Sequence, residues 1–467
     1  MKSIAFLATL AVLTALPSFV KAAPPLPLPT AEQLAWQRCE LTMFFHFGMN
    51  TFTDREWGLG KEEEKLFNPS SLDARQWVRT AKQAGFKLAI LTAKHHDGFC
   101  LWPSKFTAHC VKNSPWKGGH GDVVREFVDA CRGEGLKVGL YLSPWDRNNR
   151  AYGSSAYNDY FVAQLTELLS NYGPIDEMWF DGACGEGPNG RKQVYDWARY
   201  YATIRRLAPH ALIAISGPDI RWVGNESGVA RVNESSMRPD GKTPDGQPRQ
   251  KWYPAECDVS IRPGWFYHAG EDAKVKPLAK LLEIYFASVG RNSVLLLNVP
   301  PDRRGLLADA DCRRLHELAA AVDVLQRGQI KAIASAAGGV PAASSAVQAI
   351  DGNLDTYWSP GLGTTTGNLE LDFGAPRAFN VVNIQEAIAL GERVTKYRVD
   401  AELPDGWRTL VRGAVIGHRN LYAVATTTAR RVRLVVEAAR LPPCIAEFSV
   451  HLMPLAPPPL KTPLAAN

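Results

Sequence analysis

The sequence predicts an α/β fold, a TIM-like (β/α)8 barrel followed by a β-sandwich domain. Short apolar segments alternate with amphipathic segments at a spacing of roughly 40 residues over the first two thirds of the chain. Polar residues follow directly after many of these apolar segments. At 467 residues and 46% hydrophobic content, the chain exceeds what one core usually sustains, so two domains are expected.

The apolar segments are the predicted barrel strands. Their nearly continuous hydrophobicity is typical of strands that are buried on both faces of a parallel sheet. In chain order they are residues 41–47, 87–92, 137–143, 177–180, 212–216 and 294–298. A doubly wound sheet has the same alternation. The barrel is favoured because chemically useful residues follow so many of the strands, as they do at the C-terminal face of a barrel.

Helices are predicted between these strands. Acidic or hydroxyl residues at their starts and glycines at their ends are the usual signals of helix boundaries. The segments are 72–84, 123–132 and 157–172, and a further helix is expected over 306–326. The character of the chain changes near Gly328. Alternating strands such as 369–373 and 431–436, separated by turn residues at short intervals, predict the β-sandwich.

The termini complete the predicted domain organisation. A basic start, a short apolar run and small residues before a proline-rich stretch predict a secretory signal peptide, too short to span a membrane. The protein is therefore expected to be secreted or periplasmic, without a membrane anchor. The expected ranges are 1–23 for the signal peptide, 24–328 for the barrel, 329–453 for the β-sandwich and 454–467 for a proline-rich, disordered tail.

Composition excludes some partners. The formal net charge of +6 is modest for this length and the basic residues are spread out, so no nucleic-acid partner is expected. Eight cysteines are scattered without any Cys-x-x-Cys, which argues against a metal knuckle. Cys100 and Cys110 are candidates for a disulfide in an exported chain, and free buried thiols are an equal alternative. No metal and no cofactor are expected.

Two carboxylates are the candidate catalytic pair. Asp181 follows a predicted strand and precedes glycine, so its side chain is expected at the mouth of the barrel as a nucleophile, although an Asp before Gly is often only a turn former. Glu226 lies in a loop after the next strand and is the candidate general acid and base, with Asp219 and Glu256 as rivals. Such a pair cleaves a glycosidic bond without a metal or cofactor.

Other polar and aromatic residues are expected to bind sugar. His95 and His96 follow the second strand, and neutral imidazoles offer a donor and an acceptor to hydroxyl groups. Zinc binding and structural packing are the alternatives for this pair. Similar positions, expected to form a hydroxyl-binding rim with aromatic platforms, are occupied by His46, Glu56, Trp57, Tyr141 and Trp265.

At these residues the chain resembles the alpha-L-fucosidases of glycoside hydrolase family 29. The motifs that carry the resemblance are His46-Phe47-Gly48, Glu56-Trp57-Gly58, Lys94-His95-His96-Asp97-Gly98-Phe99, Tyr141-Leu142-Ser143 and Trp179-Phe180-Asp181-Gly182. In that family the Asp after Trp-Phe is the nucleophile, which implies this role for Asp181. The resemblance also implies a fucose site formed by His46, Glu56, Trp57, His95, His96, Tyr141 and Trp179.

Two further segments resemble the subgroup that is specific for α-1,3 and α-1,4 linkages. They are residues 217–228 and 262–268. In that subgroup the Glu of Gly-Asn-Glu is the acid, which is Glu226 here, and the second segment adds Arg262 and Trp265 as candidate substrate-binding residues. The resemblance implies exo-hydrolysis, with retention of configuration, of terminal fucose on an oligosaccharide or glycoprotein glycan.

The C-terminal region, residues 330–452, resembles discoidin or factor 5/8 type C domains, a galactose-binding-like shape shared with family 32 carbohydrate-binding modules. Residues 349–359 and the strand 369–373 carry this resemblance. It implies a domain that supports the barrel, with galactose-type binding as a weaker alternative. Calcium binding is a further alternative, for which oxygen ligands are available on Asp351, Asn353 and Thr356.

Two other functional classes stay open at this point. A carbohydrate-binding protein for fucose or galactose could keep the pocket without turnover, although both carboxylates are present. A metal-dependent hydrolase built on the paired histidines would lose activity with a chelator.

Overall fold

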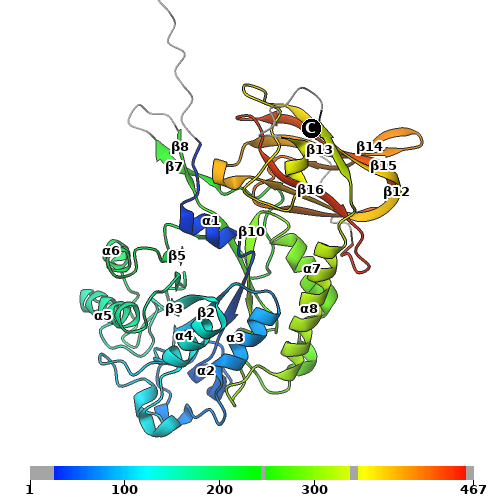
Figure 1. Ribbon diagram of the computed structural model, residues 1–467. Helices are drawn as coiled ribbons and strands as arrows, with labels where there is room; N and C mark the ends of the chain where they lie inside the picture. Colours follow the sequence, from blue (N-terminus) through cyan, green and yellow to red (C-terminus); the bar gives the residue numbers. More distant parts are fainter. Residues whose placement is uncertain (1–25, 243–247, 337–344, 459–467) are drawn as a thin grey trace, which may run out of the picture.

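The computed structural model describes residues 26–242, 248–336 and 345–458. The predicted signal peptide, residues 1–23, lies outside these ranges, as does most of the predicted tail. The described chain forms a barrel with helices on its outside and a C-terminal β-domain that lies beside α7 and α8 (Figure 1). Among the described helices, none is long and apolar enough to span a membrane.

The barrel consists of eight parallel strands in the order β5-β4-β3-β2-β1-β10-β9-β6. A single bridge between Ala214 and Ile220 joins its two edges, so the barrel is nearly closed. The strands are β1 (Leu41–Phe45), β2 (Leu88–Lys94), β3 (Lys137–Leu142), β4 (Glu177–Phe180), β5 (Leu212–Ile215), β6 (Arg221–Trp222), β9 (Ala255–Ser260) and β10 (Ser293–Asn298). The six predicted strands and the predicted fold class are confirmed, whereas β6 and β9 were not anticipated.

Helices cover the outside of the barrel. All four predicted helices are present, with ends that differ by a few residues. The helices are α1 (Ala31–Gln37), α2 (Met49–Thr53), α3 (Ala74–Gln83), α4 (Val123–Glu134), α5 (Ser155–Asn171), α6 (Trp197–Leu207), α7 (Leu278–Ala287) and α8 (Asp309–Arg327). Between β6 and β9 the chain forms a hairpin of β7 (Met237–Lys242) and β8 (Pro248–Trp252) in place of a helix.

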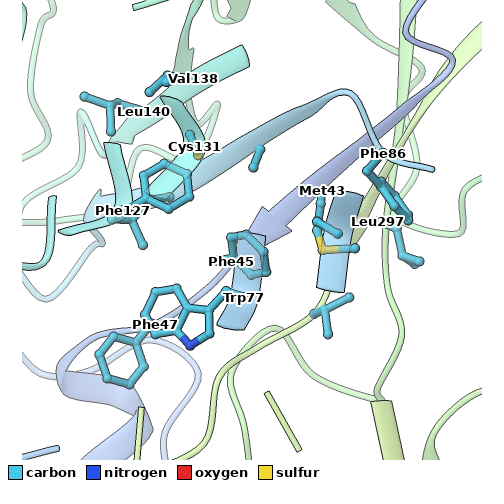
Figure 2. Packing of buried hydrophobic residues seen from close by; sticks show 14 of the residues in the cluster. Met43, Phe45, Phe47, Trp77, Phe86, Phe127, Cys131, Val138, Leu140 and Leu297 are labelled. Carbon is cyan, nitrogen blue, oxygen red and sulfur yellow. The ribbon is translucent and has the colours of Figure 1, made fainter. Parts of the chain in front are cut away.

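Alternate residues of each strand face opposite sides of the barrel wall. Outward from β1, Phe45 packs against Trp77 of α3 and Phe127 of α4, with ring centroids 5.7 and 6.1 Å away (Figure 2). Phe44, which lies between Met43 and Phe45 in the strand, faces inward. Its ring centroid lies 5.2 Å from that of Trp179. The outer apolar layer therefore fixes each strand, and the inner layer supports whatever lies at the strand ends.

The interior of the barrel is not purely apolar. Trp36 of α1 donates its indole N–H to the buried carboxyl of Glu177 at 2.9 Å. Higher in the barrel, Trp179 donates to the buried carboxyl of Glu256 at 2.7 Å. Burial raises the pKa of Glu177 to about 8 and that of Glu256 well above its usual range, so both carboxyls hold their protons at neutral pH.

The C-terminal domain is an antiparallel β structure. Its strands are β11 (Ile333–Ala336), β12 (Gly367–Glu386), β13 (Val394–Leu403), β14 (Gly406–Gly413), β15 (Asn420–Ala439) and β16 (Ile445–His451). The long strands β12 and β15 pair along both their halves, with register shifts between the halves. One buried cluster contains Leu369 from the first half of β12 and Ile384 from the second, so the sheet folds over a single core around Trp358.

Polar contacts join the two domains. Glu40, just before β1, accepts from Arg419 at 2.7 Å and faces the ring of His418 at 3.0 Å. Before β10, the buried amide of Asn292 donates to Glu392 at 2.7 Å and accepts from the backbone N–H of His418 at 2.7 Å. The β-domain thus contacts β1 and β10 at their N-terminal ends.

The eight cysteines, all within the described residues, are free thiols. Cys100 and Cys110 are backbone neighbours in a β-bridge, yet they form no disulfide. Of the two alternatives that the sequence left open, the structure has free, mostly buried thiols.

Candidate active site

A cavity of about 300 Å³ opens at the C-terminal ends of the barrel strands. Its wall combines carboxylates, imidazoles and large aromatic rings, which is the composition that a sugar-binding site requires. The lining residues are Phe44, His46, Trp57, His95, His96, Trp179, Asp181, Gly182, Ala183, Ile215, Trp222, Glu226, Asp258 and Trp265.

Asp181 lies at the floor of this cavity, immediately after β4. One carboxylate oxygen accepts the backbone N–H of Ala183 at 2.7 Å, and the other accepts the hydroxyl of Tyr141 at 3.2 Å. The Nε2 atom of His96 lies 3.8 Å from the second oxygen. Burial raises the pKa of Tyr141 well above its usual range, so its hydroxyl remains a donor. The carboxylate is held in place from two sides while its side chain stays 26% exposed.

Three neutral histidines surround the floor. Burial lowers the pKa of His46 to about 3 and that of His96 to about 4, and lowers the pKa of His95 well below its usual range. His46 Nδ1 lies 2.8 Å from the amide oxygen of Asn298, and His96 Nδ1 lies 2.7 Å from Ser143 Oγ.

These contacts assign the tautomers. The amide nitrogen of Asn298 and the hydroxyl of Ser143 already donate to backbone carbonyls. The oxygen of Asn298 therefore accepts from Nδ1–H of His46, and the oxygen of Ser143 accepts from Nδ1–H of His96. The Nε2 atoms of both histidines are left as acceptors. His95 Nδ1 accepts from Asn50 at 3.3 Å, which leaves Nε2–H as a donor. The cavity therefore offers hydroxyl groups both kinds of partner.

Glu226 also lines the cavity, from a segment that we call the rim loop, residues 223–230. Asn225 organises this loop, because its side-chain oxygen accepts from Ser227 N at 3.1 Å and its amide donates to Val229 O at 2.8 Å. Gly224 adopts a φ of 102°, which a side chain would disfavour. The Glu226 side chain is exposed, whereas that of Asp181 is half-buried.

The two rival acids do not line the cavity. Asp219 accepts the backbone N–H of Ile213 at 2.8 Å and pairs with Arg205 at the edge of the barrel. Glu256 lies in the barrel interior, bound to the indole of Trp179. Of the three candidates for the acid, only Glu226 has its carboxyl in the cavity.

Glu56 has a different position from the one predicted. Its carboxylate accepts the backbone N–H groups of Trp265 at 2.7 Å and Phe266 at 3.3 Å, and it lies 2.6 Å from the ring of His268. It is not among the residues that line the cavity. Glu56 therefore holds the loop that places Trp265 over the site, while its neighbour Trp57 lines the cavity itself.

Arg262, which was predicted to contact substrate, lies outside the cavity lining. Its side chain is fully buried beneath the Trp265 loop and does not line the cavity. The guanidinium pairs with Asp311 at 2.9 Å and with Asp272 at 2.8 Å, and it stacks on Tyr267. Because both carboxylates bind the guanidinium, Arg262 stabilises the loop and does not face the cavity.

Sequence reasoning missed Asp258, a third carboxyl in the cavity. It lies on β9 and accepts the indole N–H of Trp222 at 2.7 Å. Burial, together with the nearby Glu226 and Asp181, raises the pKa of Asp258 to about 7. The available signal was the alternation of polar residues along β9, at 256, 258 and 260, which places every second side chain inside the barrel.

The candidate metal ligands are engaged in other contacts. His95 and His96 bond to Asn50 and Ser143, and within the described ranges no group of three His, Cys, Asp or Glu residues has a geometry suited to a metal. In the β-domain, the carboxylate of Asp351 accepts from Asn353 N and from the Thr356 hydroxyl, both at 2.8 Å, as in a hydrogen-bonded turn.

Comparison with known proteins identifies the family of this chain. A family model described as alpha-L-fucosidase matches residues 36–325, and the F5/8 type C domain model matches residues 329–447. The chain belongs to the alpha-L-fucosidase family. It is thus a glycoside hydrolase with alpha-L-fucosidase activity, whose C-terminal region is an F5/8 type C domain.

Relatives match along most of their length. Alpha-L-fucosidase 1 of Arabidopsis thaliana is 41% identical over 450 residues, which are 92% of this chain and 88% of that protein. A putative alpha-L-fucosidase from Bacteroides ovatus has a crystal structure with a TM-score of 0.80 and 46% identity, over 94% of this chain and 76% of that chain. A Ruminococcus gnavus GH29 fucosidase mutant in complex with fucose has a TM-score of 0.85 and 30% identity, over 94% and 98% of the respective chains.

Proposed function

We propose that the enzyme hydrolyses terminal α-1,3- or α-1,4-linked fucose with retention of configuration, and that Asp181 is the nucleophile and Glu226 the acid and base. The observation that carries this proposal is that both carboxyl groups line one cavity in unlike settings. Asp181 is fixed by two hydrogen bonds, and Glu226 is exposed on the rim loop.

The first step forms an ester. A carboxylate oxygen of Asp181 attacks the anomeric carbon, the bond from that carbon to the glycosidic oxygen breaks, and Glu226 gives its proton to that oxygen. The donors from Tyr141 and Ala183 N orient the attacking carboxylate. The negative charge passes from Asp181 to Glu226, so the cavity keeps the same total charge.

The second step releases fucose. Glu226, now ionised, takes a proton from water, whose oxygen attacks the anomeric carbon from the side that the leaving group vacated. The ester bond to Asp181 breaks and the carboxylate is restored. Two inversions at one carbon give net retention. A carboxyl separation of about 5 to 5.5 Å suits this mechanism, whereas about 6.5 to 9.5 Å suits inversion.

The remaining cavity residues suit a 6-deoxy sugar. Fucose presents three hydroxyl groups and one methyl group. The acceptors of His46 and His96 and the donor of His95 match hydroxyls, and the rings of Trp179 and Trp265 provide apolar surface for the methyl group. A missing hydrogen bond to a buried partner costs about 1 to 3 kcal/mol, so this set discriminates against other sugars.

The linkage preference is supported by residues 217–228 and 262–268, whose sequences resemble the α-1,3/α-1,4-specific subgroup. The protein would be incubated with Lewis-type trisaccharides and with α-1,2-fucosylated lactose, and free fucose would be measured. We expect release from the Lewis-type compounds. Release from the α-1,2 compound alone would contradict the linkage assignment.

The variant Asp181→Ala distinguishes hydrolysis of the substrate from binding of the substrate. The variant should lose fucose release and still bind a fucosylated trisaccharide in calorimetry. Unchanged hydrolysis would remove Asp181 from the mechanism.

We also propose that the protein acts outside the cytoplasm on oligosaccharide or glycoprotein glycans. The basic and apolar start of the sequence supports export. Expression of the full chain, followed by N-terminal sequencing of the exported product, tests this. A mature start near Ala23 or Pro24 is expected, and full-length protein retained in the cytoplasm would contradict export.

A further inference from the structure

His268 lies between two carboxylates at the end of the Trp265 loop, residues 262–268. Its Nδ1 atom is 2.8 Å from Asp54 Oδ1, and its Nε2 atom is 2.6 Å from Glu56 Oε1. Carboxylate oxygens accept hydrogen bonds, so the donor at each of these contacts is a ring N–H. Both ring nitrogens therefore carry protons, and His268 is an imidazolium in this arrangement.

Two further elements bring charged groups near this imidazole. From the segment after β10, Arg303 Nη2 lies 4.0 Å from the Asp54 oxygen that faces the ring. Glu271, whose backbone N–H donates to the carbonyl of His268, pairs its side chain with Lys274 at 3.2 Å. Burial opposes the positive charge, but the hydrogen bonds to the two carboxylates outweigh it and raise the pKa of His268 above its ordinary value of 6.5.

The Glu56 carboxylate is enclosed by the backbone of the same loop. It accepts from the N–H groups of Trp265 at 2.7 Å and Phe266 at 3.3 Å. A Cβ atom added to Gly264 would collide with Glu56 Oε1, so the backbone passes directly over the carboxylate. One carboxylate thus binds three donors of this loop, of which His268 is the charged one.

The Trp265 loop also packs against histidines of the sugar site. The ring centroid of Trp265 lies 5.1 Å from that of His46. The ring centroid of Phe266 lies 5.0 Å from that of His95. The carbonyl of Trp265 accepts from the amide of Asn298, whose oxygen accepts from His46. A displacement of the loop would therefore move a wall of the cavity and the contacts that orient these histidines.

We propose that His268 is a positioning residue for the fucosidase reaction, and that its imidazolium holds the loop against the sugar site by joining Glu56 to Asp54. His268 does not line the cavity and touches no reacting atom. Arg262 anchors the start of the loop, and His268 anchors its end. The inference rests on the proposed role of Trp265 in binding fucose.

Loss of one proton would break this arrangement. A neutral imidazole has one N–H and one lone pair, so it donates to one carboxylate and repels the other. Because the folded-state pKa of His268 is raised, its charge is complete below 6.5 and is lost as the pH rises through the higher, folded-state pKa. The affinity of the site for fucose should fall over that range of pH.

The test is the competitive inhibition constant of L-fucose from about pH 5 to pH 9, measured against the fucosylated oligosaccharide that the enzyme hydrolyses fastest. His268→Gln keeps an N–H donor and removes the charge. At acidic pH its inhibition constant should exceed that of the parent by about 3- to 10-fold, with little change in kcat. At alkaline pH the ratio of the two constants should approach one, because His268 of the parent is then neutral as well.

The ratio isolates His268, since the pH effects of the other cavity groups are common to both proteins. A side chain that only fills space would give the same ratio at every pH. A ratio that does not change with pH, whether it equals one or exceeds it, would overturn the proposal.

His210→Gln is the matched control. His210 Nδ1 also lies 2.8 Å from a carboxylate, that of Glu32, but neither residue lines the cavity. The inhibition constant of this variant should equal the parental value at every pH.

Asp54→Asn is the second variant, which keeps the proposal testable should His268→Gln not fold. Asp54 is 57% exposed, so its substitution leaves the packing of the loop intact. Removal of one of the two charges that favour the imidazolium lowers the pKa of His268. The inhibition constant should therefore begin to rise at a lower pH than in the parent. A parental pH profile would count against the proposal.

Trp265→Ala separates this inference from the proposed function. If this variant binds fucose as tightly as the parent, the role of Trp265 in the sugar site fails. If it binds fucose more weakly and the ratio for His268→Gln is the same at every pH, the role of His268 alone fails.

Discussion

The floor and the rim of the cavity hold their carboxyls in opposite ways. At the floor, Asp181 follows directly from a buried strand and receives two hydrogen bonds. At the rim, Glu226 is exposed on a loop that asparagine and glycine organise. A nucleophile gains from a fixed position, because misplacement by about 1 Å can cost 10²-fold in rate. An acid that must also admit water and a variable leaving group gains from an accessible position.

Loss of the rim carboxyl should have the largest effect. Glu226→Gln removes the proposed proton donor while keeping the shape of the side chain, and kcat/KM for an oligosaccharide should fall by about 10²- to 10⁴-fold. For an aryl fucoside with a good leaving group the fall should be much smaller. Steady-state rates on both substrates measure this. An equal fall on both would show that Glu226 does not act as the acid.

Removing a hydrogen bond to Asp181 should have the next largest effect on activity. Tyr141→Phe removes one of the two donors to Asp181, and kcat/KM should fall by about 10- to 100-fold on both substrates, since a lost hydrogen bond to a charged group costs roughly 1.5 to 3 kcal/mol. Tyr152→Phe is the control, because its hydroxyl bonds to Tyr195 outside the cavity. If both variants lose the same activity, the contact with Asp181 has no special role.

A smaller effect on activity is expected from Glu56, which does not line the cavity but holds the loop that carries Trp265. Glu56→Gln weakens the support of the Trp265 loop, and KM for an oligosaccharide should rise by about 3- to 10-fold with little change in kcat. Initial rates over a range of substrate concentrations distinguish a change in KM from a change in kcat. A collapse of kcat at constant KM would instead assign Glu56 to the chemistry.

The smallest effect concerns stability rather than rate. Burial raises the folded-state pKa of Glu177 from 4.5 to about 8. The contribution of the protonated carboxyl to the stability of the fold is therefore complete below pH 4.5, and it is lost as the pH rises through 8. Glu177→Gln should reduce the difference in unfolding free energy between pH 5 and pH 8 by about 1 to 3 kcal/mol. Denaturant titrations at the two pH values measure it. An unchanged difference would mean that Glu177 is ionised in the folded protein.

The strands that the sequence revealed are those whose apolar stretches are nearly uninterrupted. β1 to β5 and β10 are buried on both faces, so their hydrophobicity is nearly continuous. β9 was missed because Glu256, Asp258 and Ser260 alternate with apolar residues, since every second side chain enters the polar interior of the barrel. β6 has only two residues, too few for any pattern. Asp258 was overlooked for the same reason as its strand.

Residue types at strand ends indicated the cavity but not the contacts within it. Asp181, Glu226 and the three histidines were identified because polar residues after barrel strands gather at one face. Glu56 and Arg262 lie in equally polar segments, yet their partners, the Trp265 backbone and Asp311, are distant in sequence. Only the folded chain shows that these two charges hold a loop.

Asp181 is proposed to form an ester with the sugar, and trapping that ester is the decisive experiment. An activated 2-deoxy-2-fluoro-fucoside slows both steps, while its good leaving group keeps the first step faster than the second. After incubation and proteolysis, mass spectrometry should locate the added sugar on the peptide that contains Asp181. A sugar attached to a different residue, or no adduct together with a first-formed product of inverted configuration, would exclude Asp181 as the nucleophile.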